Sequence, residues 1–115
     1  MMCLKNETRG TVLAERVKVV DTFAGRFRGL MLTDSFPSET DAIILKPCNS
    51  VHTMLMRYPI DIIFIGKDNQ VLHCCHNLAP GRLSPVIRGA KAVAELPTGT
   101  VGYSDTSIGD RLYIG

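Results

Sequence analysis

The residue types best suited to chemistry are concentrated in one segment, Pro47 to Asp61. Its sequence, PCNSVHTMLMRYPID, contains a thiol, an imidazole, thioethers, a guanidinium and a carboxylate. Cys48 and His52 are joined by a turn that begins at Pro47, and such a turn can bring a thiol close to an imidazole. A thiolate held against an imidazole, with Asp61 to orient the ring, is a minimal arrangement for cysteine nucleophilic catalysis. The segment therefore predicts a candidate site, whose chemistry depends on how the segment folds.

The same segment contains a ligand set for a soft metal ion. Alternate side chains of a strand share a face, so His52, Met54 and Met56 would lie together if the segment is extended. An imidazole and thioethers beside the thiolate of Cys48 suit copper(I). However, an apolar stripe on a strand is usually core, and methionine often fills core space. We therefore expect no metal and no cofactor, and keep copper(I) binding as an alternative.

A second run of metal-binding residue types, HCCH at residues 73–76, does not predict a zinc site. On a strand the run separates into two pairs that face opposite sides of the sheet. The usual zinc-ligand pairs leave two or more residues between ligands, and this run lacks that spacing. The same alternation places Cys74 and Cys75 poorly for a disulfide, and we expect all four cysteines to be reduced.

Asp61 stands out because it lies between Ile60 and Ile62, at the start of a strand that should be buried. A buried carboxylate needs partners, and we favour a structural role in which arginines or backbone amides supply them. The other side chains that could line a pocket with it come from the same segment and from the loop at residues 79–85. The candidate ligand-binding residues are Cys48, His52, Thr53, Met56, Arg57, Asp61 and Arg82.

The chain has 115 residues, the size of one domain, which we expect to span residues 1–115. Its net charge of +2 and the absence of a basic run interleaved with aromatic residues argue against a nucleic-acid partner. No apolar run is long enough to cross a bilayer, so we expect no membrane partner. The start, MMCLKNETRG, lacks the apolar stretch of a secretory signal. These features predict a soluble, cytoplasmic protein that is a monomer or a weak homodimer.

The apolar periodicity and the turn residues predict a mainly β fold (β-rich α+β) with one or two short helices. The predicted strands are residues 2–7, 11–20, 42–46, 51–56, 60–65, 70–76, 90–96 and 111–114. Asp21 should cap a helix over residues 22–28 that ends at Gly29, and Thr98 should cap a helical turn over residues 99–103. Regularly spaced short strands of this kind favour a small antiparallel β-barrel or half-barrel.

Several short strings, taken together and in order, resemble those of a known family. They are RFRGLM (26–31), PC (47–48), HT (52–53), MR (56–57), PID (59–61) with Phe64, Pro80, Arg82, GA (89–90), EL (95–96), Gly99 and GD (109–110). The chain resembles, over about residues 9–113, the bacterial and archaeal family called domain of unknown function 192. The resemblance implies a small domain dominated by β-strands, and it implies no activity. Many members resemble exported or lipid-anchored proteins, whereas this chain begins without a signal segment.

We expect a non-catalytic ligand-binding or accessory module that takes an unidentified small ligand or protein partner. One alternative is a small enzyme that uses Cys48, His52 and Asp61. It requires the Cys48 sulfur or an Asp61 oxygen close to a ring nitrogen of His52. The other alternative is a copper(I) protein that uses Cys48, His52, Met54 and Met56.

Overall fold

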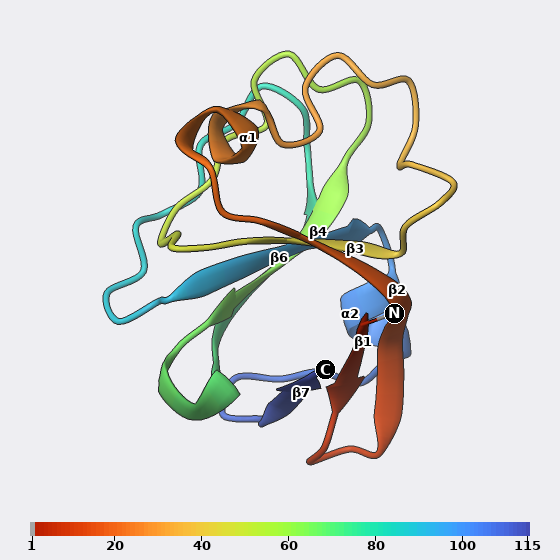
Figure 1. Cartoon of the computed structure of the whole chain (residues 1–115), viewed down its shortest axis with the longest axis vertical. Helices are drawn as coiled ribbons and strands as arrows, with labels where there is room; N and C mark the ends of the chain where they lie inside the picture. Colours follow the sequence, from red (N-terminus) through yellow and green to blue (C-terminus); the bar gives the residue numbers. More distant parts are fainter. Residues whose placement is uncertain (1) are drawn as a thin grey trace.

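The structure, a computed structural model, describes residues 2–115 and contains one seven-stranded sheet with two short α-helices (Figure 1). In chain order the elements are β1 (Met2–Asn6), β2 (Thr11–Val20), α1 (Phe23–Arg28), β3 (Ala42–Leu45), β4 (Ile60–Ile65), the 3-10 turn η1 (Lys67–Asn69), β5 (Val71–Leu78), β6 (Ala92–Pro97), α2 (Thr100–Tyr103) and β7 (Leu112–Ile114). The mainly β fold class predicted from the sequence is confirmed.

The sheet is curled into a half-barrel. Its strand order is β5-β4-β6-β3-β2-β1-β7, and every neighbouring pair is antiparallel except β2 with β3. The parallel pair arises because the chain crosses over through α1 between these strands. The two edge strands come together where Gln70 bridges Arg111 and the Val71 amide donates to the Asp110 carbonyl at 2.8 Å.

In β3, β4 and β6 both faces of the sheet are buried, which explains why these strands are almost continuously apolar. One face fills the half-barrel with a cluster that includes Leu4, Ile44, Ile63 and Leu96. The other face is covered by α1 and the loops that follow α1 and β3 (Figure 1). Its cluster consists of Leu30, Ile43, Leu45, Val51, Met56, Ile60, Ile62, Phe64 and Val93.

The predicted strand over residues 51–56 is wrong, although the structure describes all of these residues. The segment is a loop in which only His52 makes a bridge, to Leu83. Leu55 has a φ of 61°, which ends any extended run. The Thr53 hydroxyl donates to the Ala79 carbonyl at 2.6 Å, so side-chain bonds to the backbone take the place of a strand ladder. The shared face expected for the histidine and the methionines therefore does not form.

Both predicted helix caps are also wrong, each by one residue. The Thr22 hydroxyl, rather than the Asp21 carboxylate, accepts from the Gly25 amide at 3.1 Å and caps α1. Gly99, rather than Thr98, is the cap residue of α2, and it has no side chain to offer. The prediction that Gly29 ends α1 is confirmed.

Candidate functional site

A pocket of about 350 Å³ lies between α1 and the loop that follows β3. Residues 26–29 form one side of the pocket and residues 47–52 form the other. Leu45 of β3 and Glu95 of β6 belong to the sheet and form the floor. The pocket therefore contains two of the residues predicted from the sequence, Cys48 and His52, and one that was not predicted, Glu95.

Glu95 lies in the middle of the most buried part of the sheet. In the register of β6 it is opposite Ile43 of β3 on one side and Ile62 of β4 on the other. Its side chain is 2% exposed, and its Oε1 atom has no hydrogen-bond partner. Burial raises the pKa of Glu95 to about 7. Near neutral pH this carboxyl therefore exchanges between a neutral and an ionised form.

The end of α1 lies directly against this carboxyl. Gly29 has a φ of 46°, and a Cβ atom at this position would be 3.1 Å from Glu95 Oε1. Such a contact is tighter than ordinary van der Waals distance, and the left-handed backbone disfavours a side chain as well. Gly29 therefore allows the helix to end beside Glu95, whose side chain lines the pocket.

Cys48 is half-buried and has the properties of a neutral thiol. Its Sγ atom donates to the Ser50 carbonyl at 3.0 Å. Burial raises the pKa of the Cys48 thiol by more than the backbone hydrogen bond with Ser50 lowers it; the Glu95 carboxyl raises it further, and Arg26 lowers it. A raised pKa lowers the fraction of reactive thiolate, so this environment does not activate a nucleophile.

His52 fastens the loop to α1. Its Nε2 atom lies 2.9 Å from the Phe27 carbonyl, and its Nδ1 atom accepts from the Met54 amide at 3.2 Å. Because Nδ1 is an acceptor, Nε2 carries the proton and donates to the carbonyl. The ring also packs against the Phe27 ring, with 5.2 Å between centroids. Both ring nitrogens are thus bonded to backbone groups, and neither is bonded to Cys48 or Asp61.

The other five predicted residues, Asp61 among them, lie outside the pocket lining. Thr53 is buried in the loop, where its hydroxyl accepts from the Arg82 amide at 2.9 Å. Met56 is buried in the core cluster on the same face of the sheet as α1. Arg57 pairs with Asp34 at the surface, and the Arg82 side chain is exposed.

Asp61 faces the opposite side of the sheet from Glu95 and bonds to backbone amides. Its carboxylate accepts from the Asn77 amide at 2.8 Å and from the Val101 amide at 2.9 Å. The second of these bonds caps the start of α2 from β4, a strand that is distant in the sequence but packs against the helix. The arginines expected as partners of Asp61 make no ion pair with it in the described part of the chain.

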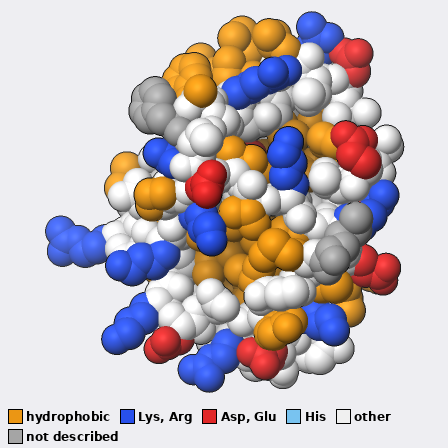
Figure 2. All heavy atoms as spheres, in the orientation of Figure 1, with side chains coloured by type: hydrophobic (Ala, Val, Ile, Leu, Met, Phe, Trp, Pro, Cys, Tyr) orange, Lys and Arg blue, Asp and Glu red, His pale blue; other side chains and the backbone are white. Residues whose placement is uncertain are grey.

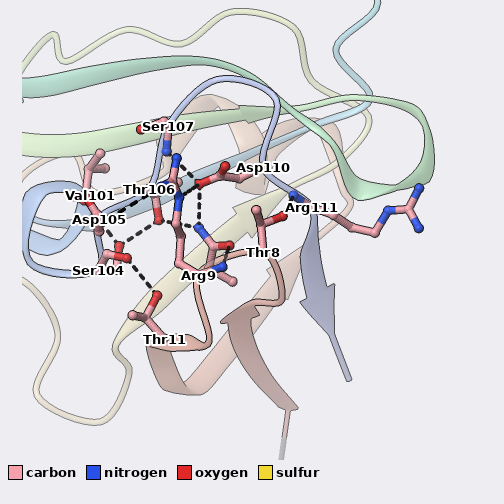
Figure 3. A network of polar contacts seen from close by, with 11 residues as sticks. Thr8, Arg9, Thr11, Val101, Ser104, Asp105, Thr106, Ser107, Asp110 and Arg111 are labelled. Carbon is pink, nitrogen blue, oxygen red and sulfur yellow. Dashed lines mark hydrogen bonds and ion pairs between the residues drawn. The ribbon is translucent and has the colours of Figure 1, made fainter.

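A second polar cluster surrounds Asp110 and joins the β1–β2 hairpin to the turn before β7 (Figure 3). The Asp110 carboxylate accepts from Arg9 Nε and Asn6 Nδ2, each at 3.0 Å, and from the Ser107 amide at 2.9 Å. Burial alone would raise the pKa of Asp110, but these bonds outweigh burial and hold the pKa below its ordinary value. All of its partners belong to the protein, so we interpret this cluster as structural.

Sequence reasoning missed Glu95, although a signal for it was present. Residues 92–97 read AVAELP, so the carboxyl lies between apolar residues in a strand, as Asp61 does. If this strand were exposed on one face, Glu95 would be expected at the surface. Once both faces of β6 are known to be covered, the same residue has to be buried.

No group of three or more His, Cys, Asp or Glu side chains within residues 2–115 is arranged to hold a metal ion. No helix in the same residues is long and apolar enough to cross a membrane. On the face shown in Figure 2, Lys and Arg side chains are interspersed with Asp and Glu side chains among apolar ones. On that face, the described residues therefore form no continuous patch of one charge.

Comparison with known sequences agrees with the resemblance noted above. The model of the domain of unknown function 192 family, described as "Uncharacterized ACR", matches residues 4–114. The chain belongs to this family. A UPF0127 protein of Thermococcus sibiricus is 37% identical over 117 residues, which covers 95% of this chain and 72% of that protein. A UPF0127 protein of Pyrococcus furiosus is 33% identical over 114 residues, which covers 93% of this chain and 93% of that protein.

Two solved structures share the fold of this family member. A protein of unknown function from Novosphingobium aromaticivorans has a TM-score of 0.81 at 22% identity, covering 97% of this chain and 82% of that one. A protein from Sinorhizobium meliloti, named as a candidate transcription regulator, has a TM-score of 0.79 at 23% identity. This second match covers 98% of this chain and 91% of that one. At these identities the likeness is one of fold alone.

Proposed function

We propose that the protein binds a small molecule in the pocket between α1 and the loop at residues 47–52, and that Glu95 recognises it. The observation that carries this proposal is the buried Oε1 atom of Glu95, which has no partner. A buried polar atom without a hydrogen bond costs about 1–3 kcal/mol of stability. A ligand that bonds to this oxygen removes that cost.

The rest of the pocket supports the same proposal. Phe27, Leu45 and Val51 supply apolar surface, and a small number of polar groups converge on the same space. Small-molecule sites in proteins typically combine an apolar lining with a few fixed polar groups in this way. The bond from His52 to the Phe27 carbonyl holds the two sides of the pocket together.

Binding is favoured over catalysis because the pocket lacks an activated nucleophile. The Cys48 thiol donates to a backbone carbonyl, and both ring nitrogens of His52 are occupied. Acid–base catalysis by Glu95 has one supporting observation, its pKa of about 7, which suits proton transfer at neutral pH. No second reactive side chain is hydrogen-bonded to this carboxyl in the described residues.

Replacing Glu95 by leucine tests the proposal. Glu95→Leu keeps a side chain of similar size and removes the unpartnered oxygen, so we expect a folded protein of equal or higher stability. Small-molecule fragments that shift the backbone amide NMR signals of residues 26–29 and 48–52 in the natural protein should lose at least about tenfold in affinity. The matched control, Glu7→Leu, changes an exposed glutamate outside this pocket and should leave binding unaltered.

Two results would contradict the proposal. One is a fragment screen in which all hits shift signals elsewhere in the protein. The other is unchanged affinity of pocket-directed fragments for the Glu95→Leu variant.

We also propose that this binding module is a single domain, residues 1–115, that acts in the cytoplasm as a monomer or a weak homodimer. The single sheet and the absence of a membrane-crossing helix among residues 2–115 support this organisation. Cell fractionation together with sedimentation of the purified protein checks it.

A further inference from the structure

The charges around the pocket limit the kind of molecule that it can hold. Arg26 and Arg28 line it from α1, and Glu95 is the only acidic residue in its lining. In the described part of the chain, neither arginine forms an ion pair with a carboxylate. Arg26 Nη1 donates to the Asp21 carbonyl at 2.8 Å, which holds this guanidinium at the pocket without neutralising it. The walls of the pocket therefore carry an unbalanced positive charge.

The floor of the pocket is a carboxyl that burial holds toward its neutral form. The other titratable groups that line the pocket are Arg26 and Arg28 from α1 and Cys48 and His52 from the loop. Tyr58 also lies within the influence of Glu95, since its pKa is raised mainly by burial and also by Glu95. None of these groups hydrogen-bonds to its Oε1 atom. A neutral carboxyl donates one hydrogen bond as well as accepting others, so it can bind an oxygen that bears negative charge.

These observations are difficult to reconcile with a cationic ligand. An amine would lie close to two guanidinium groups, which repel it. It would also require an ionised Glu95, although burial among Ile43, Ile62 and the α1 end disfavours that form. An anion has neither difficulty, because the arginines attract it and the neutral carboxyl donates to it.

We propose that the pocket binds a small organic acid, whose carboxylate accepts a hydrogen bond from the Glu95 carboxyl in the field of Arg26 and Arg28. The apolar body of the acid packs against the side chains of Phe27, Leu45 and Val51. This inference rests on the proposed function, since it names the class of ligand for the same pocket.

Three probes of the same length and different charge test the inference. They are pentanoate, which is negative, pentylammonium, which is positive, and pentanamide, which is neutral. Binding to the natural protein is measured by NMR titration at millimolar probe concentrations, at pH 6 and at pH 8. We expect pentanoate to bind at the pocket at least about tenfold more tightly than pentylammonium at pH 6. Its affinity should fall about tenfold between pH 6 and pH 8, because only the neutral form of Glu95 donates to it.

A conservative variant separates the role of the proton from a purely structural role. The amide of Glu95→Gln donates a hydrogen bond but does not titrate, so this variant should bind pentanoate with an affinity that stays constant from pH 6 to pH 8. Arg28→Gln should weaken pentanoate binding about fivefold, whereas Arg88→Gln, an exposed arginine outside the pocket, should leave it unchanged.

The outcomes distinguish this inference from the proposed function. Tighter binding of pentylammonium than of pentanoate, or pentanoate affinity that rises with pH, overturns the organic-acid assignment and leaves the pocket as a small-molecule site. The same assignment is overturned if Glu95→Gln retains the full pH dependence. If none of the three probes shifts the backbone amide signals of residues 26–29 and 48–52, the proposed function itself is overturned.

Discussion

At the scale of single residues, Glu95 and Asp61 show two ways in which a protein can accommodate a carboxyl inside a sheet. Asp61 is 1% exposed, and backbone amides occupy both of its oxygens. Glu95 is 2% exposed and leaves an oxygen unbonded. The first arrangement stabilises the fold. The second leaves hydrogen-bonding capacity unused in a side chain that lines the pocket, and for that reason we assign recognition to Glu95.

The raised pKa of Glu95 predicts a pH dependence of stability. A glutamate in the unfolded chain ionises near pH 4.3, whereas Glu95 in the folded chain ionises near pH 7. Between these values mainly the unfolded chain loses its proton. The Glu95 contribution to the free energy of unfolding is therefore fully present below about pH 4 and is lost as the pH rises to about 7. The loss is on the order of 4 kcal/mol, from about 1.4 kcal/mol per unit of pKa.

Glu95→Gln should remove this loss, since glutamine does not titrate. Urea unfolding at a series of pH values from 4.5 to 7.5 should show the natural protein becoming progressively less stable relative to the variant. Glu7→Gln, which changes an exposed residue, is the control and should give a nearly constant difference. A constant difference for Glu95→Gln as well would show that Glu95 ionises normally in the folded protein.

At the scale of elements, α2 depends on a residue of β4 for its first turn. The helix has four residues and its cap residue is Gly99, so no side chain of its own bonds to the first amides. The Asp61 carboxylate supplies that bond from the adjacent strand and also binds the Asn77 amide at the end of β5. One side chain thus holds three elements in register, which agrees with the structural role favoured for it from the sequence.

Asp61→Ala should destabilise the protein by about 2–4 kcal/mol, because it leaves the buried Val101 amide and the part-buried Asn77 amide without their partner. The midpoint of urea denaturation measures this change. Asp21→Ala, which replaces an exposed aspartate that does not cap α1, should change stability by less than about 0.5 kcal/mol. Equal effects of the two substitutions would contradict the role given to Asp61.

At the scale of the whole molecule, the sequence predicts the strands well and the site only in part. The hairpin of β4 with β5 follows from the turn residues at 66–69, and β3 ends at Leu45, before Pro47 and one residue earlier than predicted. The prediction of a strand over residues 51–56 was wrong because the alternation of side-chain types there fits a strand and also fits a loop held by Thr53. The pattern alone does not specify which backbone groups bond to one another.

Glu95 was missed for a different reason, which is the topology of the sheet. Its burial depends on the crossover that places α1 over β6, and this contact joins residues far apart in the chain. Cys48 and His52 were found because their residue types are chemically distinctive. A single glutamate in a strand does not stand out as a candidate site residue until the helix that covers it is known.

A titration of Glu95 itself tests the central claim most directly. The carbon-13 NMR signal of its side-chain carboxyl, assigned by comparison with Glu95→Gln, is followed against pH with and without pentanoate. We expect a midpoint near pH 7 in the free protein, and a higher midpoint when pentanoate is bound, because the ligand binds the neutral form. A midpoint close to the ordinary value of about 4.3, or one that pentanoate leaves unchanged, would contradict it.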